Sequence, residues 1–206
     1  MLFIPPKKNV CGYANARQNF PRVETMRYKS TMCRYDAVEL LTRDQAVITQ
    51  LFHDYERLLP LQGASARKAE IVAQLCLVLT VHSQVEEDIF YPAVLDKCGP
   101  KAFTKQILMD HDGAQELVAR LEKMQPGDTD YDATVAVLNA YVAPHMVNER
   151  EYIYPKAVSA GLDMQALGQK IHLRQKELYE NVAHRRARLA TDEEPALPLA
   201  TNVMMG

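Results

Sequence analysis

The sequence predicts an all-α protein, an up-down antiparallel four-helix bundle with a fifth, C-terminal helix packed alongside. Along several long segments apolar residues recur at steps of three and four, the spacing of a helix with one buried face. Short segments with proline or glycine separate these helices, so consecutive helices are expected to be antiparallel neighbours. Glycine makes up only 8 of 206 residues, and valine and isoleucine show no period of two, which argues against a sheet.

One motif occurs twice. Residues 82–92 read HSQVEEDIFYP, and residues 145–155 read HMVNEREYIYP. Each copy places a glutamate four residues after a histidine, so the two side chains lie on the same face of a helix. Two such faces directed at each other suit a metal site inside a helix bundle. The tyrosines that end the motifs, Tyr91 and Tyr154, are expected to pack in the core, with tuning of a nearby metal as the alternative.

The first helix is predicted over residues 36–59. Asp36 is a suitable N-cap residue, and Glu39 three residues later completes a capping box. One polar residue, Gln45, lies in the middle of the apolar stripe of this helix. Pro60 ends the helix, because proline cannot continue its backbone hydrogen bonds.

The second helix is predicted over residues 65–95, with His82 and Glu86 on its apolar stripe. Pro92 is expected to kink or terminate it, because proline lacks the backbone donor and its ring clashes with the preceding turn. Gly99 is expected to mark the turn that follows.

The third helix is predicted over residues 101–124 and carries His111 on its apolar stripe. Residues 109–111 read MDH, and residues 43–45 of the first helix read RDQ at the corresponding place. By this internal comparison Gln45 occupies the place that His111 holds in the other half. The two halves of a shared site are therefore expected to be unequal.

The fourth helix is predicted over residues 130–158, with His145, Glu149 and Tyr152 on its inward face. Pro144 lies inside this pattern, so a local bend just before His145 is expected.

The chain is therefore divided into an irregular basic N-terminal tail at 1–35, a helical bundle at 36–188 and a C-terminal tail at 189–206. The last part of the bundle, 164–188, is the fifth helix, which is expected to pack outside the four-helix core.

Charge is distributed unevenly along the chain. Residues 1–34 hold seven basic residues and one acidic residue, a balance of 7 − 1 = +6, so the remainder of a chain with net charge −2 carries −2 − 6 = −8. An acidic bundle offers no compact basic face for nucleic acid. For the tail two alternatives stay open, a transit peptide or an over-long start with Met26 or Met32 as the true first residue.

The four cysteines show no C-x-x-C or zinc-finger spacing and suggest no disulfide framework, which favours a reducing compartment and a cytoplasmic protein. Cys76 lies in an apolar helical run and is expected to be a small core residue. No stretch is long enough to span a membrane, and the first residues have too short an apolar run for a signal peptide.

The polar residues on the stripes need an explanation. A single histidine on an apolar stripe is most often a satisfied core residue, and one His–Glu pair can be a simple side-chain pair. Here three histidines, two glutamates and one glutamine fall on the stripes of four consecutive helices near one level. Two facing buried carboxylates are unfavourable unless they are protonated or neutralised by cations. We therefore interpret as metal ligands the residues His82, Glu86, His111, His145 and Glu149, with Gln45 as a weaker ligand through its amide oxygen.

The ligand types indicate which metal to expect. Imidazole and carboxylate without thiolate suit iron or manganese and tolerate zinc. Two carboxylates from opposing helices suit a pair of cations about 3.5–4 Å apart. Open positions beside redox-active iron would bind small molecules, namely O2, H2O2 or NO.

Four segments carry a family resemblance: DAVELLTRDQ, VHSQVEEDIFYPAV, MDHDGAQELVARL and APHMVNEREYIYP. Through them, residues 36–186 resemble the hemerythrin-like family, also called the HHE cation-binding domain. The resemblance implies an up-down four-helix bundle around a non-haem di-iron centre with an oxo or hydroxo bridge. In that family helices 2 and 4 each supply a histidine and a bridging glutamate, and helices 1 and 3 each supply one histidine. These roles fall on His82, Glu86, His111, His145 and Glu149, whereas Gln45 stands where the family has histidine.

Family members bind oxygen, sense or store iron, sense oxygen or NO, or turn over peroxide, and the resemblance does not choose among these. We favour a di-iron protein that binds or senses O2, peroxide or NO, with peroxidase- or catalase-like turnover as an open possibility. Because of Gln45, a metal-poor bundle with a structural or interaction role is the alternative. Iron storage or delivery is a third reading.

Overall fold

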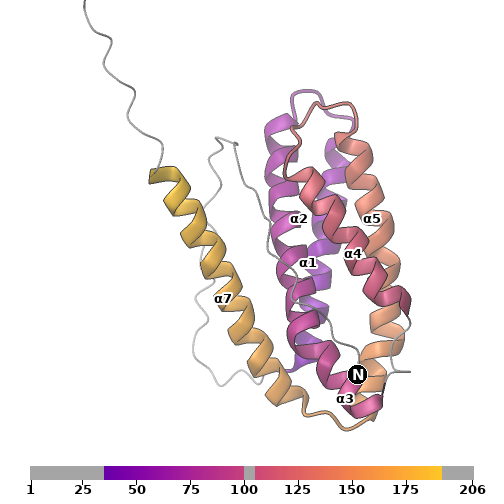
Figure 1. Cartoon of the computed structure of the whole chain (residues 1–206). Helices are drawn as coiled ribbons and strands as arrows, with labels where there is room; N and C mark the ends of the chain where they lie inside the picture. The colour runs from indigo at the N-terminus through magenta and orange to yellow at the C-terminus, as the bar shows by residue number, and fades with distance from the viewer. Residues whose placement is uncertain (1–34, 100–104, 192–206) are drawn as a thin grey trace, which may run out of the picture.

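The computed structural model describes residues 35–99 and 105–191, and all their regular elements are helices. In chain order these are α1 (Ala37–Leu58), α2 (Ser65–Val85), η1 (Glu86–Phe90), α3 (Tyr91–Cys98), α4 (Lys105–Leu121), α5 (Tyr131–Asn148), η3 (Glu149–Ile153), α6 (Tyr154–Ser159) and α7 (Met164–Thr191). Four helical rods, namely α1, α2 to α3, α4 and α5 to α6, form the bundle, and α7 lies alongside it (Figure 1). The predicted all-α bundle with a fifth helix is therefore confirmed.

The two predicted tails, 1–35 and 189–206, lie outside the described residues except for Tyr35 and the end of α7 at Thr191. The predicted start of the third helix at residue 101 also lies outside them. The predicted N-cap at Asp36 is confirmed, because its Oδ1 accepts a hydrogen bond from the Glu39 amide at 3.1 Å.

Two π-helical turns interrupt the second and fourth rods. In η1 the amide of Tyr91 bonds to the carbonyl of Glu86, and in η3 the amide of Tyr154 bonds to the carbonyl of Glu149. Each of these tyrosines is followed by proline, which cannot bond to the carbonyl four residues before it and needs room for its ring. A widened turn provides that room without ending the rod. The predicted stop at Pro92 is therefore wrong, since helix α3 continues to Cys98, and the irregularity before the proline is the π turn.

The π turns also change which residues face inward. Each widened turn adds a residue, so the inward face moves one position along the chain. Tyr152, predicted inward, is 64% exposed, whereas Ile153 and Tyr154 are buried. The same shift places Tyr91 and Tyr154 directly after the turns that begin with Glu86 and Glu149.

Two apolar clusters form the core. The first joins α1, α2, α4 and α5 and includes Cys76, which confirms its predicted core position. The second joins the start of α1 and the end of α2 with η1, α3, η3, α6 and α7. On the rods that contribute to both clusters, the polar stripe residues lie between the two. The bundle thus holds one polar layer between two apolar ones.

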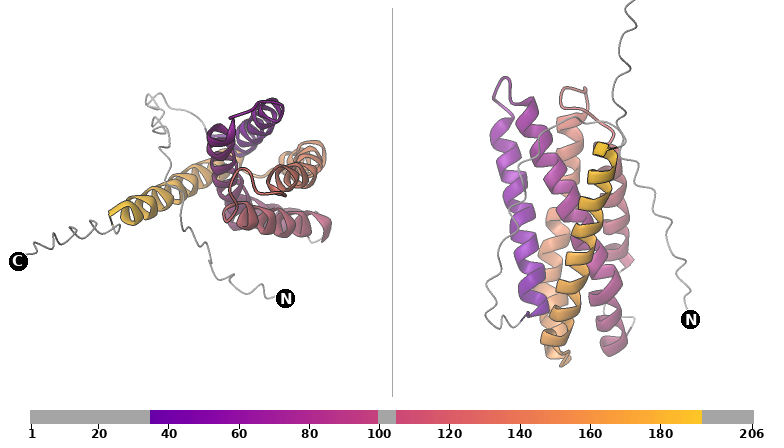
Figure 2. Two further views of the ribbon diagram at one scale, coloured as in Figure 1. Left: turned by 90° about the horizontal axis from the view of Figure 1, so that it is seen from above. Right: turned by 90° about the vertical axis from the view of Figure 1, so that its left-hand side faces the viewer.

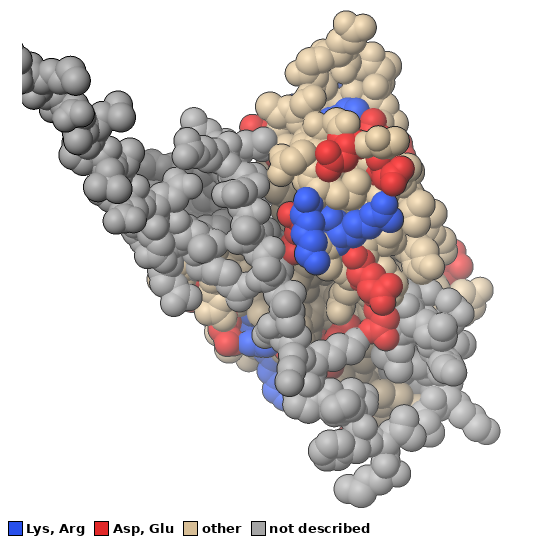
Figure 3. Space-filling model, turned by 45° about the horizontal axis from the view of Figure 1, so that its top comes forward, with Lys and Arg blue, Asp and Glu red and all other residues tan. Residues whose placement is uncertain are grey.

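Helix α7 packs on α1 and α2, with Leu167 and Ile171 buried, while its far end diverges from the bundle (Figure 2). Gly168 allows α7 to approach the backbone at the start of α1 closely. A Cβ atom at this glycine would lie 1.9 Å from the Tyr35 carbonyl oxygen, so only glycine fits there without backbone movement. None of the helices in the described part of the chain has the length and apolar character needed to cross a membrane. On the face drawn in Figure 3, basic and acidic side chains adjoin one another.

Candidate metal centre

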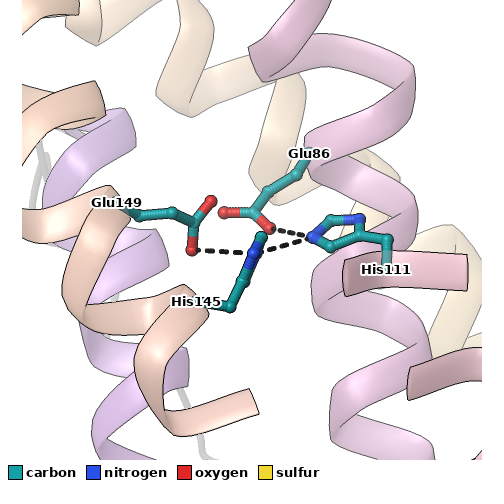
Figure 4. A group of neighbouring side chains, drawn as sticks. All are labelled: Glu86, His111, His145 and Glu149. Atoms are coloured by element: carbon teal, nitrogen blue, oxygen red, sulfur yellow. Dashed lines mark hydrogen bonds and ion pairs between the residues drawn. The ribbon is translucent and has the colours of Figure 1, made fainter. Parts of the chain in front are cut away.

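Four buried side chains from four different elements meet in the polar layer. Glu86 begins η1, His111 lies on α4, His145 on α5, and Glu149 begins η3. Each offers a donor atom, and these atoms lie within 4.8 Å of one another (Figure 4). The i, i+4 spacing places a histidine and a glutamate on one helix face, and the packing of the rods brings faces from distant segments together.

The distances between donor atoms are short. The Nε2 atoms of His111 and His145 lie 2.9 Å apart. His111 Nε2 lies 3.6 Å from Glu86 Oε2, and His145 Nε2 lies 3.5 Å from Glu149 Oε2. These contacts join both halves of the chain in one cluster.

His82 approaches the cluster from α2. Its Nε2 lies 3.5 Å from Glu86 Oε2, and the residue is 3% exposed. Within the described residues, neither ring nitrogen of His82 has a hydrogen-bond partner. A buried polar atom without a partner is costly, so this imidazole has unused bonding capacity beside a carboxylate.

Gln45 lies beside Glu149, but its oxygen is directed elsewhere. Its Nε2 donates to Glu149 Oε2 at 2.8 Å and to the Tyr154 hydroxyl at 2.7 Å. Its Oε1 accepts a hydrogen bond from the Arg150 guanidinium at 2.8 Å. Because a guanidinium only donates, this contact fixes which end of the amide carries the oxygen. The amide N–H groups, not the oxygen that would bind a metal, face Glu149 and Tyr154.

The two tyrosines of the repeated motif cross between the halves. Tyr91, five residues after Glu86, donates to Glu149 Oε1 at 2.6 Å, and Tyr154, five residues after Glu149, donates to Glu86 Oε1 at 3.1 Å. The Tyr91 hydroxyl also lies 3.2 Å from His111 Nε2. Both tyrosines are buried as predicted, and the carboxylate contacts are additional. The recurring Tyr-Pro pair is the sequence signal that could have indicated them.

Outer carboxylates face two of the histidines, and sequence analysis missed both. Glu87 Oε1 lies 3.1 Å from His111 Nδ1 and accepts a hydrogen bond from Gln115 at 3.2 Å. Asp44 Oδ2 lies 3.6 Å from His82 Nδ1. A carboxylate in hydrogen-bond range of Nδ1, as Glu87 is for His111, holds the imidazole in one tautomer and orientation, whereas Asp44 lies just beyond that range from His82. Asp44 immediately precedes Gln45, and Glu87 immediately follows Glu86, so neither is marked by helical periodicity.

Burial dominates the electrostatics of the centre. Glu86 and Glu149 are both 0% exposed. Burial, and then the nearby Glu149 carboxylate, raise the pKa of Glu86 well above its ordinary value. Burial and these two carboxylates also raise the pKa of the Tyr91 and Tyr154 hydroxyls, which therefore stay protonated and donate. A cation beside the two carboxylates would reverse the first effect, because it stabilises their charged form.

The donor set fits such a cation. Imidazole and carboxylate oxygen are ligands that iron, manganese and zinc accept. A cation here would give the ring nitrogen of His82 a bonding partner. It would also neutralise the charge of the two buried, facing carboxylates.

A small cavity adjoins the histidines. Its volume is about 20 Å³, whereas one water needs about 10–15 Å³. It is lined by Leu79, His82, Ser83, His111, Ala114, Tyr141, Val142, His145 and Met146. Tyr141 is 45% exposed and lies against Gly113, where a Cβ atom would come within 2.8 Å of its ring. Apart from the histidines, Ser83 and Tyr141 the lining is apolar, and the volume is too small for a large molecule.

Comparison with known proteins agrees with this geometry. Residues 36–192 match the family described as hemerythrin HHE cation binding domain. A solved structure, the crystal structure of a hemerythrin HHE cation binding domain-containing protein from Mycobacterium kansasii, is similar with a TM-score of 0.60. It is 18% identical, and the match covers 73% of this chain and 91% of the other, so the likeness concerns the fold. No curated protein sequence matches the chain significantly. Because the family match spans the whole bundle and its polar layer, this chain belongs to the hemerythrin HHE cation binding domain family.

Proposed function

We propose that this protein holds a non-haem iron centre in its polar layer and uses it to bind or sense O2, H2O2 or NO. The His/Glu cluster and the family support a metal-binding hemerythrin-like protein. Imidazole and carboxylate ligands suit iron. A bound iron ion would also supply open coordination positions and redox activity, which binding of O2, H2O2 or NO requires.

The residues divide into two unequal groups around the carboxylates. His111 and His145, with Nε2 atoms 2.9 Å apart, provide two imidazoles from α4 and α5. From α1 and α2, among the described residues, His82 is the only imidazole that reaches the carboxylates, and Gln45 presents N–H groups. We propose that one ion is held firmly by His111, His145, Glu86 and Glu149, and that a second ion beside His82 is held more weakly. Gln45 then orients Glu149 and leaves a coordination position open.

The small cavity beside the histidines is the observation that supports a small ligand. A volume of about 20 Å³ has room for a molecule of two to four atoms and excludes an organic substrate. Its lining contains three histidines that face the centre and no charged side chain, which favours an uncharged molecule such as O2, NO or H2O2. Tyr91 and Tyr154 each donate a hydrogen bond to a carboxylate, so the centre has two proton donors among its own side chains.

The test is a metal count and an optical spectrum of the full-length purified protein. We expect one to two iron ions per chain, and absorption that changes when O2, H2O2 or NO is added to the reduced protein. The matched control is Glu149→Gln, which keeps the shape of the side chain and removes a charged ligand. Iron that binds without any response to the three molecules favours storage or delivery. A protein that folds and takes up no metal favours the structural role and contradicts the proposal.

A further inference from the structure

Helix α7 lies outside the four-helix core, yet it makes a polar contact that leads to the metal centre. Gln175, only 9% exposed, donates from Nε2 to Asp44 Oδ2 at 2.6 Å. The same oxygen of Asp44 lies 3.6 Å from His82 Nδ1. Gln175 on α7, Asp44 on α1 and His82 on α2 therefore form a row from the outer helix to the centre.

An equivalent row supports His111 and clarifies what this one does. Gln115 donates to Glu87, and Glu87 faces His111 Nδ1 at 3.1 Å. In both rows a glutamine holds a carboxylate, and the carboxylate faces the Nδ1 atom of a histidine whose Nε2 is directed at the centre. Such outer partners orient a metal-binding imidazole and raise its basicity. The difference is that Gln115 lies on α4, the helix of His111 itself, whereas Gln175 belongs to a separate helix.

A second contact of α7 reaches the element that carries Glu86. Arg174 forms an ion pair with Asp88 at 2.9 Å, and Asp88 lies on η1, the π turn that begins with Glu86. Both residues are about one third exposed, at 31% and 34%, so this pair is weaker than the Gln175 contact. Helix α7 thus contacts both α1, which carries Asp44, and η1, which begins with Glu86.

We propose that α7 controls how firmly the His82 side of the centre holds its ion, and that ion binding in turn tightens α7 on the bundle. Gln175 and Asp44 are the positioning residues of this control. A shift of about 0.5 Å would bring Asp44 into hydrogen-bond range of His82 Nδ1, with Nε2 left to bind the ion. Because linkage is reciprocal, an ion that needs a docked α7 must also stabilise the docked state. The inference rests on the metal site of the proposed function.

The first experiment compares iron release to a chelator from two full-length variants. Gln175→Leu removes the contact, and Gln169→Leu is the matched control, since Gln169 is an exposed glutamine of the same helix. We expect Gln175→Leu to release its more labile ion about 10- to 100-fold faster, the effect typical of losing an outer partner. Gln169→Leu should release it at the wild-type rate.

The second experiment follows α7 itself by hydrogen exchange of its backbone amides, with and without iron. Iron should slow exchange over residues 164–178 in the wild type and in Gln169→Leu, and should have little effect in Gln175→Leu. Asp44→Asn provides a second variant, because it removes the charge beside His82 and retains an oxygen for Gln175. It should also release iron faster, and adding Gln175→Leu to it should have no further effect, because the two residues act in one row.

Equal release from Gln175→Leu and Gln169→Leu, or α7 exchange that iron leaves unchanged in the wild type, would overturn the inference. If Gln175→Leu fails to fold, the effect of iron on α7 exchange in the wild type decides. A protein with the expected differences that responds to none of O2, H2O2 and NO would refute the proposed ligand chemistry and still support the inference. A protein that takes up no metal would overturn both.

Discussion

Replacing Gln45 with histidine should make the two sides of the centre more alike. In the wild type the amide donates to Glu149 and Tyr154 and accepts from Arg150, all within 2.8 Å. A histidine keeps at most one donor toward the carboxylate and loses the Arg150 contact. It gains a ring nitrogen that can bind a metal, which the inward-facing amide N–H groups cannot do.

For the stability of Gln45→His, the structure predicts a loss in the metal-free protein and a recovery when metal is bound. Gln45 is 1% exposed, and its contacts to Glu149 and Arg150 are charge-assisted. Losing one such bond costs about 1.5–3 kcal/mol, so metal-free Gln45→His should be less stable by that amount. An ion present at 100 times its dissociation constant raises the free energy of unfolding by about 2.7 kcal/mol. With iron in excess, the variant should therefore recover most or all of the loss.

The assay is a metal titration with release to a chelator, together with urea unfolding of the metal-free and metal-loaded proteins. The wild type should release its ions in two phases, and Gln45→His in phases of more similar rate. Gln50→His is the control, because Gln50 is an exposed glutamine on the same helix. The reasoning is refuted if the wild type releases two ions at one rate and the substitution changes neither that rate nor the stability.

Three further predictions concern other parts of the molecule. Since burial and Glu149 raise the pKa of Glu86 above its usual 4.5, the folded metal-free protein holds this proton more tightly than the unfolded chain does, so its stability should fall as pH rises above about 4.5, by up to about 1.4 kcal/mol per unit. Glu86→Gln should remove that slope in urea unfolding at several pH values, and an unchanged slope would show that another group is responsible. Gly168→Ala should destabilise the protein by about 1–3 kcal/mol, because its Cβ would lie 1.9 Å from the Tyr35 carbonyl oxygen; a change below about 0.5 kcal/mol in the same unfolding assay would mean that α7 moves freely. A chain that begins at Met32 should bind as much iron as the full chain, because every proposed ligand lies after residue 36, and loss of iron from the shorter chain would contradict this.

The helices and the residues of the polar layer could be predicted from the sequence because both depend on local spacing. A histidine and a glutamate four residues apart share a helix face whatever surrounds them. The Asp36 cap and the core position of Cys76 follow from similarly local rules. The internal repeat then placed the polar residues of all four rods at one level, where the structure has them.

The departures have two sources, an irregular helical turn and contacts with residues distant in sequence. Tyr152 was predicted inward on a regular helical period, and the π turn before Pro155 moved Tyr154 into its place. The direction of the Gln45 amide depends on Arg150, a residue 105 positions away in sequence, and no pattern within one helix reveals that contact. Asp44 likewise acquires its partner Gln175 only when α7 packs on the bundle. Spacing predicts which residues meet, and packing decides how their polar atoms are oriented.

The central claim is that the cluster of His82, Glu86, His111, His145 and Glu149 binds metal. Anomalous scattering at the iron edge, from crystals grown with iron, tests it most directly. We predict one strong peak among His111, His145 and the two glutamates, and a weaker peak beside His82. Crystals of iron-supplied protein with no anomalous peak in this layer, or with iron only at the surface, would contradict the account.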